Sequence, residues 1–158
     1  MEYGVLVLVH VLCAFIWGGG VLITGFYFVP SILESGPGGG AVMAGVMKRK
    51  YSLIMGVTSI LAILTGLRLY AIRFSPAWVA TSEGIVLTLG ALLGLSAWGI
   101  GAFRQRPLAE KLGLLAKEGR HAEIPATAAQ LARIARVGAW HIVAVIVLMA
   151  GHSLAASL

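Results

Sequence analysis

Four long apolar runs set the pattern of this chain. They cover approximately residues 4–29, 51–73, 84–103 and 137–158, and short polar or glycine-rich segments separate them. A helix needs about 20 predominantly apolar residues to cross the hydrocarbon core of a bilayer, and each run is close to or above that length. The pattern therefore predicts an all-α fold: an integral membrane four-helix bundle that forms a single domain.

The segments between the runs carry signals for helix ends. Pro30 and the glycine-rich residues 34–40 predict an irregular connection after the first span. Ser75-Pro76 is expected to end the second span, and Thr81 with its polar neighbours offers a cap for the third helix.

The polar segment 104–136 is predicted to be a helical loop. Pro107 at a first helical position and Gly119 beyond the end frame one helix. Its apolar stripe consists of Leu108, Leu112 and Leu115. Pro125 opens a second helix that can run without interruption into the fourth span.

Glycines inside the spans favour close helix packing. Gly18-Gly19-Gly20 lies in the first span, and Gly90 and Gly94 form a small-xxx-small pair in the third. From these glycine-rich faces we expect a homodimer.

Composition agrees with a membrane protein. The chain is 59% hydrophobic and only 11% charged, whereas soluble domains average about 25% charged residues. The net charge of +6 comes from the first and third loops, so membrane topology accounts for it and a nucleic-acid partner is not expected. The positive-inside rule predicts a multi-pass protein of the cell inner membrane with both termini outside and these loops in the cytoplasm. The basic loop residues are Lys48, Arg49, Lys50, Arg104, Arg106, Lys111, Lys117, Arg120, Arg133 and Arg136.

Three histidines fall within the predicted spans, where ionisable residues are costly and usually functional. They are His10, His141 and His152. The topology places His10 and His152 in the outer third of the bilayer, at the level of Arg68. Two imidazoles facing each other across a bundle can ligate a haem iron, and an arginine can pair with a haem propionate. The alternative is that each histidine bonds to a carbonyl or serine and that Arg68 extends to the surface.

His141 lies near the predicted inner surface, close to Tyr51. It could ligate a second haem, although no other histidine is expected at that depth; the alternative is an interfacial histidine that contacts lipid headgroups. His10, Cys13 and Trp17 share one helix face, and with Met149 and His152 they offer soft ligands for copper. The alternative for Cys13 and Met149 is ordinary packing.

Other kinds of site are not indicated. His121 is expected to be solvated in the polar loop, and the chain has no Ser-His-Asp set, phosphate-binding loop or HExxH motif. Every carboxylate falls outside or at the edge of the predicted membrane core, which argues against a classical proton-coupled transporter.

Residues 48–55, with the sequence Lys-Arg-Lys-Tyr-Ser-Leu-Ile-Met, are followed at a distance by Gly66-Leu67. Together with His10, Trp17 and Gly18, this stretch resembles the HemJ-like family of oxygen-independent protoporphyrinogen oxidases. The resemblance implies a four-span fold, bound haem b, a porphyrinogen substrate and a role for His10. The chain also resembles the CopD-like four-span membrane proteins, which implies copper.

We therefore expect a membrane haem b redox protein that transfers electrons or oxidises a quinol or porphyrinogen. The cofactor-binding candidates are His10, His152, His141, Arg68, Trp17 and Tyr51, and the three histidines are the metal-ligand candidates. A redox partner protein or a quinone is expected as partner within the lipid bilayer. The alternatives are a copper-handling membrane protein and a non-catalytic membrane scaffold.

Overall fold

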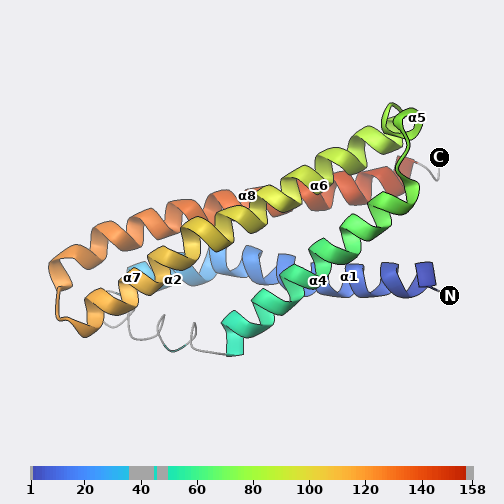
Figure 1. Ribbon diagram of the computed structural model, residues 1–158. Helices are drawn as coiled ribbons and strands as arrows, with labels where there is room; N and C mark the ends of the chain where they lie inside the picture. Colours follow the sequence, from blue (N-terminus) through green and yellow to red (C-terminus); the bar gives the residue numbers. More distant parts are fainter. Residues whose placement is uncertain (1, 36–44, 46–49, 156–158) are drawn as a thin grey trace.

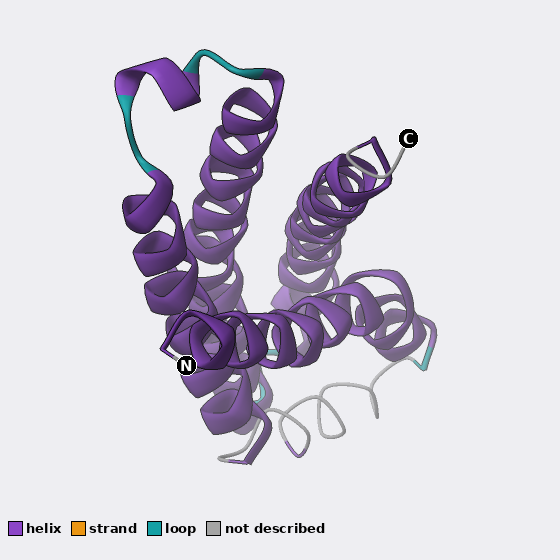
Figure 2. Ribbon diagram, turned by 90° about the vertical axis from the view of Figure 1, so that its right-hand side faces the viewer, coloured by secondary structure: helices purple, strands orange, loops and turns teal. Residues whose placement is uncertain are grey.

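The structure, a computed structural model, describes residues 2–35, 45 and 50–155, with side chains up to residue 151. In this part of the chain every regular element is a helix, and short loops join the helices (Figure 2). The predicted all-α fold is confirmed.

The described helices form four long runs. The first consists of α1 (Glu2–Ile23), the π-helix η1 (Thr24–Phe28) and α2 (Val29–Glu34). The second is α4 (Lys50–Arg73), which the short α5 (Pro76–Val79) follows. The third consists of α6 (Ser82–Ile100), the π-helix η3 (Gly101–Gln105) and α7 (Arg106–Lys117). After the 3-10 turn η4 (His121–Glu123), α8 (Ile124–Ala155) forms the fourth. All four runs are long and apolar enough to cross a membrane, so this is a multi-pass membrane protein.

The helices pack as two pairs joined through α8 (Figure 1). The most extensive contacts are those of α1 with α4 and of α6 with α8, and α8 also contacts α1, η1, α2 and α7. By contrast, α4 and α6 contact each other only sparsely. The start of α1, the end of α8 and α5 lie at one end of the bundle, which we call the terminal end. At the other end α2, α7 and the first turns of α8 form what we call the head.

Two prolines lie inside long helices and do not end them. Proline lacks a backbone N–H and its ring clashes with the carbonyl four residues earlier, so a regular α-helix would break. Here the residue before each proline closes a π turn instead: the Val29 N–H donates to the Thr24 carbonyl, and the Arg106 N–H donates to the Gly101 carbonyl. Such adjustments pair the backbone groups that a proline frees.

One predicted boundary is therefore wrong: the first helix continues through Pro30 to Glu34, where an irregular connection is predicted. The helix predicted between Pro107 and Gly119 is confirmed by α7, which has Pro107 in its first turn. It is continuous with α6 through η3, which the sequence does not indicate. The uninterrupted run from Pro125 into the fourth span is confirmed by α8.

The best-packed apolar core lies in the head. Val29 of α2, Leu115 of α7 and Leu131 of α8 are at most 1% exposed. The predicted stripe of α7 is confirmed, because Leu112 and Leu115 are buried and Leu108 packs against the same core. Nearer the terminal end, the large apolar side chains of α1 mostly face outward, as lipid contact requires.

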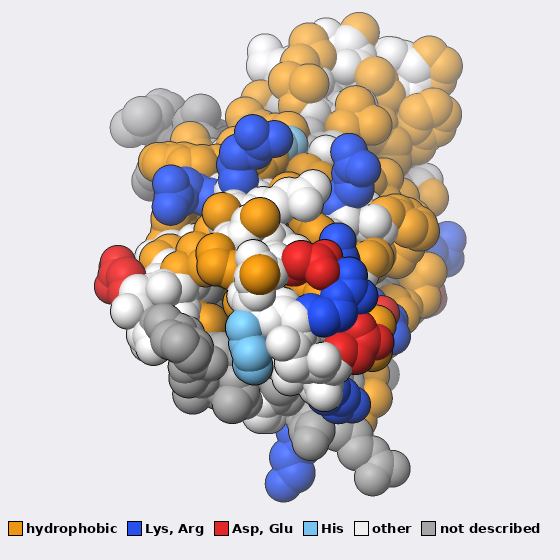
Figure 3. All heavy atoms as spheres, turned by 90° about the vertical axis from the view of Figure 1, so that its left-hand side faces the viewer, with side chains coloured by type: hydrophobic (Ala, Val, Ile, Leu, Met, Phe, Trp, Pro, Cys, Tyr) orange, Lys and Arg blue, Asp and Glu red, His pale blue; other side chains and the backbone are white. Residues whose placement is uncertain are grey.

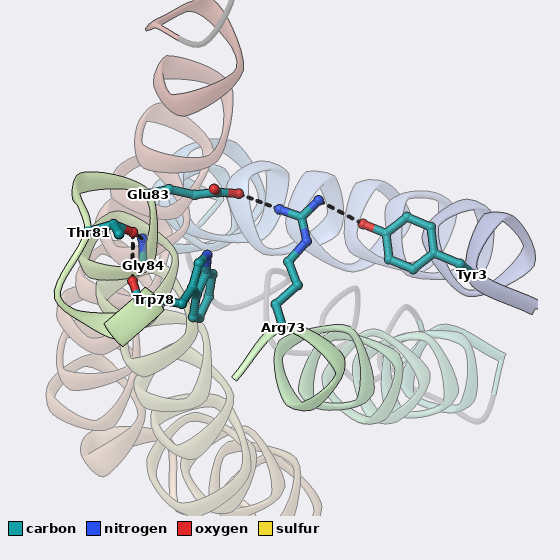
Figure 4. Close-up of polar contacts among 6 residues, drawn as sticks. All are labelled: Tyr3, Arg73, Trp78, Thr81, Glu83 and Gly84. Atoms are coloured by element: carbon teal, nitrogen blue, oxygen red, sulfur yellow. Dashed lines mark hydrogen bonds and ion pairs between the residues drawn. The ribbon is translucent and has the colours of Figure 1, made fainter. Parts of the chain in front are cut away.

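Two hydroxyl side chains cap helix starts, and a glycine follows a helix end. The Thr81 hydroxyl accepts a hydrogen bond of 3.1 Å from the Gly84 N–H at the start of α6 (Figure 4). Ser75 caps α5 in the same way. After α7, Gly119 takes a φ of +69°, a left-handed conformation that favours glycine.

Glycines allow several close helix contacts. A Cβ on Gly25 would lie 2.6 Å from the Ala135 carbonyl oxygen and 2.7 Å from the Ala139 Cβ, so η1 touches the backbone of α8 directly. Gly90 packs closely against Met149, whereas a Cβ on Gly94 would meet nothing within 4 Å. Close packing is thus confirmed at Gly90, and the expected homodimer stays a prediction.

We predict that Gly25→Ala destabilises the bundle by about 1–3 kcal/mol, because the new methyl group would press on the α8 backbone, which cannot move aside as a flexible side chain can. The matched control is Gly19→Ala, since a Cβ there meets nothing within 4 Å. The measurement is the unfolding free energy in detergent, followed by circular dichroism. Equal stability of the two variants would contradict the close contact.

Candidate functional site: a membrane histidine and a polar cavity

His10 lies on α1 and packs against α4. Its Nδ1 lies 2.8 Å from the Ala62 carbonyl oxygen and 3.4 Å from the Thr65 hydroxyl. The imidazole ring covers Gly66, where a Cβ would lie 2.7 Å from the ring carbon Cε1. Only glycine at position 66 leaves the ring room in this position. The contact is one of those that join α1 to α4.

The hydrogen bond fixes the tautomer of His10. A carbonyl oxygen can only accept, so Nδ1 donates the proton. In a neutral imidazole this leaves the Nε2 lone pair as the available ligand atom. Metal-ligating histidines have the same arrangement, because they usually donate their other ring N–H to a carbonyl or carboxylate. The carbonyl contact is also the alternative expected from the sequence, and it leaves Nε2 available for a ligand.

Of the two histidines of α8, the structure describes the side chain of His141 only. His141 is half-buried, and its Nδ1 donates to the Val137 carbonyl of its own helix at 2.9 Å. The helix includes His152, but the side chain of His152 lies outside the described residues. Pairing of His10 with His152 therefore stays a prediction. His121 is exposed, as expected for the polar loop.

Arginines at the terminal end have protein partners. Arg68 pairs with Glu2 at 3.6 Å, and both side chains are more than half exposed. Arg73 contacts the Glu83 carboxylate and donates to the Tyr3 hydroxyl at 3.2 Å, which joins α1, α4 and α6 (Figure 4). An exposed ion pair contributes only about 0–1 kcal/mol, so Arg68 can exchange Glu2 for another anion at little cost.

The described candidates for copper ligands contact different parts of the bundle. Cys13 is buried in α1, and Met149 packs against Gly90 of α6 rather than beside His10. Among the described residues no group of three or more His, Cys, Asp or Glu side chains comes together to hold a metal ion. Copper binding stays a prediction that involves the undescribed His152 side chain.

A cavity of about 330 Å³ lies between α1, α4, α6 and α8, on the side of the bundle nearer the head. This is within the size range of small-molecule sites, near its lower end. Trp17 and Tyr51, two of the predicted site residues, both line it, whereas His10 and His141 do not. The other polar lining residues are Thr24, Ser52, Ser59, Gln105, Arg106 and Glu110.

Both π turns open into this cavity. Thr24 comes from η1, and Gly101, Ala102 and Gln105 come from η3. π turns inside α-helices are frequently found at functional sites, because the extra residue changes which side chains face inward. The two prolines thus shape two walls of the same space.

A hydrogen-bonded group connects α1, η1 and α4 at the cavity wall. The Tyr51 hydroxyl donates to the Gly20 carbonyl at 3.2 Å and contacts the Thr24 hydroxyl. Because the phenol proton is directed to Gly20, the Thr24 hydroxyl serves as donor to the Tyr51 oxygen. The group fixes the position of the Tyr51 ring against the cavity.

Sequence reasoning missed Thr24 and Gln105. Thr24 begins the π turn that ends before Val29-Pro30, and Gln105 ends the π turn before Arg106-Pro107. A helix boundary placed at each proline hides both residues. Recognising that a membrane helix can continue through a proline would have indicated a π turn at each place.

The head end is strongly basic (Figure 3). Arg106 at the cavity edge donates to the Glu110 carboxylate at 2.8 Å, and Glu118 and Glu123 both contact Arg120. These two carboxylates raise the pKa of Arg120 further above its ordinary value, so this side chain stays charged.

No protein-family model, curated protein or solved structure matches this chain. The resemblance to HemJ-like and CopD-like proteins therefore stays a prediction, and the function is argued from the residues.

We predict that Tyr51→Phe destabilises the bundle by about 1 kcal/mol, because it removes the hydrogen bonds to Gly20 and Thr24. Tyr27→Phe is the control, since Tyr27 is 71% exposed on η1 and its change should stay within about 0.5 kcal/mol. Thermal unfolding in detergent measures both. A Tyr51→Phe protein as stable as Tyr27→Phe would show that the hydroxyl contributes nothing.

Proposed function

We propose that this chain is a membrane haem b protein that transfers electrons and takes them from a quinol or porphyrinogen-type compound. The observation that supports the proposal is the position of His10: its Nδ1 donates to the Ala62 carbonyl, and its Nε2 remains the available ligand atom. His10 would supply one of the two axial ligands of the iron, and we propose His152 as the other.

The bound haem iron would supply reversible one-electron chemistry. The residues of the chain would hold and orient the group. Ala62 fixes the tautomer and the ring direction of His10, and Gly66 leaves the ring room against α4. Arg68, which pairs with Glu2 near the start of α1, would exchange this partner for a propionate. His141, Trp17 and Tyr51 stay secondary candidates for cofactor contact.

We also propose a location in a bacterial inner membrane, with the head in the cytoplasm and both termini outside. The basic residues of the head support this orientation through the positive-inside rule (Figure 3).

The first expected outcome concerns the absorption spectrum. Protein purified in detergent should show a Soret band that sharpens after reduction with dithionite, because ferric and ferrous haem absorb differently. Metal analysis of the same sample should find iron and no stoichiometric copper. A colourless protein that also fails to bind added haemin would contradict the proposal, and a colourless sample with bound copper would favour copper handling instead.

The ligand role of His10 has a separate test. His10→Ala should abolish the low-spin haem spectrum, whereas His121→Ala should leave it unchanged, because His121 is exposed in the loop. Gly66→Ala should shift the spectrum or weaken haem binding, since its methyl group would displace the imidazole. The matched control is Gly94→Ala, where a Cβ meets nothing. Unchanged spectra in both His10→Ala and Gly66→Ala would exclude His10 as a ligand.

The orientation is testable with single cysteines in a Cys13→Ser background. Arg120→Cys lies on the exposed loop of the head, and Ala77→Cys lies on the exposed α5 at the terminal end. A membrane-impermeant maleimide should label Ala77→Cys in intact cells and Arg120→Cys only after lysis. The reverse labelling would contradict the proposed topology.

A further inference from the structure

The cavity near the head continues toward the middle of the bundle. A second pocket of about 210 Å³ lies between α4 and α6, and Ile60 and Trp98 line both spaces. The lining of the second pocket is entirely apolar: Ile60, Ile63, Leu64, Leu95 and Trp98. The two spaces adjoin at Ile60 and Trp98: the first has polar lining near the head, and the second is an apolar groove farther from it, in which Ile60 and Leu64 are 50% and 58% exposed.

The polar part offers hydrogen-bond donors. Tyr51, Thr24 and Ser59 already have partners, since the Ser59 hydroxyl donates to the Gly56 carbonyl at 2.9 Å. Within the described part of the chain, the Gln105 amide and the Trp17 indole N–H make no hydrogen bond to another residue. Unpaired donors that line a cavity favour a ligand with acceptor oxygens.

The walls favour a flat ligand. Indole rings of Trp17 and Trp98 line the space, and aromatic rings stack on planar groups. Small residues provide the remaining wall, and a Cβ on Gly56 or Gly101 would meet no atom within 4 Å. The open space beside these glycines leaves room for a ring between the helices.

The charged residues that line the cavity, Arg106 and Glu110, pair with each other at its edge. The cationic residue at the cavity edge, Arg106, is paired with Glu110 at 2.8 Å, so its charge is already compensated. Because both side chains are more than half exposed, the pair contributes only about 0–1 kcal/mol, and competition with phosphatidylglycerol distinguishes a neutral headgroup from a phosphate.

We infer that this double cavity binds a quinone, with the ring and its carbonyl oxygens in the polar part and the isoprenoid tail in the apolar pocket. This deepens the proposed function, on which it rests for its redox role: it gives the quinone partner a site between α4 and α6. The binding itself requires no haem, and the described histidines His10 and His141 do not line the cavity.

The test uses haem-free full-length protein in detergent, titrated with a short-tailed ubiquinone analogue. Quinones quench tryptophan fluorescence, and Trp17 and Trp98 line the site. We expect saturable quenching, after correction with free tryptophan amide, and a smaller saturable part in Trp17→Phe. Quenching that rises linearly without saturation would overturn the inference.

Cavity variants locate the binding. Gly56→Phe fills the open space and should weaken binding about tenfold or more, whereas Gly94→Phe, on α6 and outside the cavity lining, should change it less than about twofold. Gln105→Leu removes a donor without adding bulk and should also weaken binding. It provides the test if Gly56→Phe does not fold. Unchanged affinity in the folded variants, or displacement of the quinone by phosphatidylglycerol, would overturn the inference.

A further variant separates the two proposals. His10→Ala should bind the quinone analogue as the parent protein does, because the cavity does not include His10. Loss of the haem spectrum with retained quinone binding would leave the cavity assignment standing. Haem binding without saturable quenching would overturn the quinone site and leave the proposed haem function standing.

Discussion

The need to pair every backbone polar group inside a bilayer is the constraint on which this structure depends. Two prolines each remove a donor from a membrane-spanning helix, and a π turn directly before each one restores continuous hydrogen bonding. The widened turns place Gly25 against α8 and direct Thr24 and Gln105 to a shared cavity. The backbone requirement and the candidate binding site therefore have one local origin.

Packing divides the molecule into two regions of different character. In the head, Val29, Leu112 and Leu131 are buried in one cluster that joins three helices into a dense core. Toward the middle of the bundle, α4 and α6 touch sparsely, and two adjoining pockets are lined by residues of both helices. This arrangement resembles that of many binding proteins, in which a rigid region supports a space that can accept a ligand.

The sequence predicted the helices better than it predicted the site. Apolar runs, the Thr81 cap, the Gly119 stop and the leucine stripe of α7 identified nearly all elements, because these signals are local. Pro30 misled at the end of the first span, since its usual effect on a soluble helix is overridden in lipid, whereas Pro107 marked the start of α7 but not its continuity with α6. The cavity joins residues such as Trp17 and Gln105 that are far apart in the chain. Their proximity depends on helix packing, which no local pattern encodes.

The π turns also determine which side chains of the helices in the head face the core. A π turn holds one residue more than a regular turn, and each residue of an α-helix turns the chain by about 100°. If η3 relaxed to a regular helix, α7 would rotate by about that angle, carry Leu112 out of the core cluster and turn the buried Leu115 away from its neighbours. The packing of these leucines in the head therefore favours the wide turn of η3. Because residues of η3 also line the cavity, the shape of the cavity depends on how α7 packs in the head.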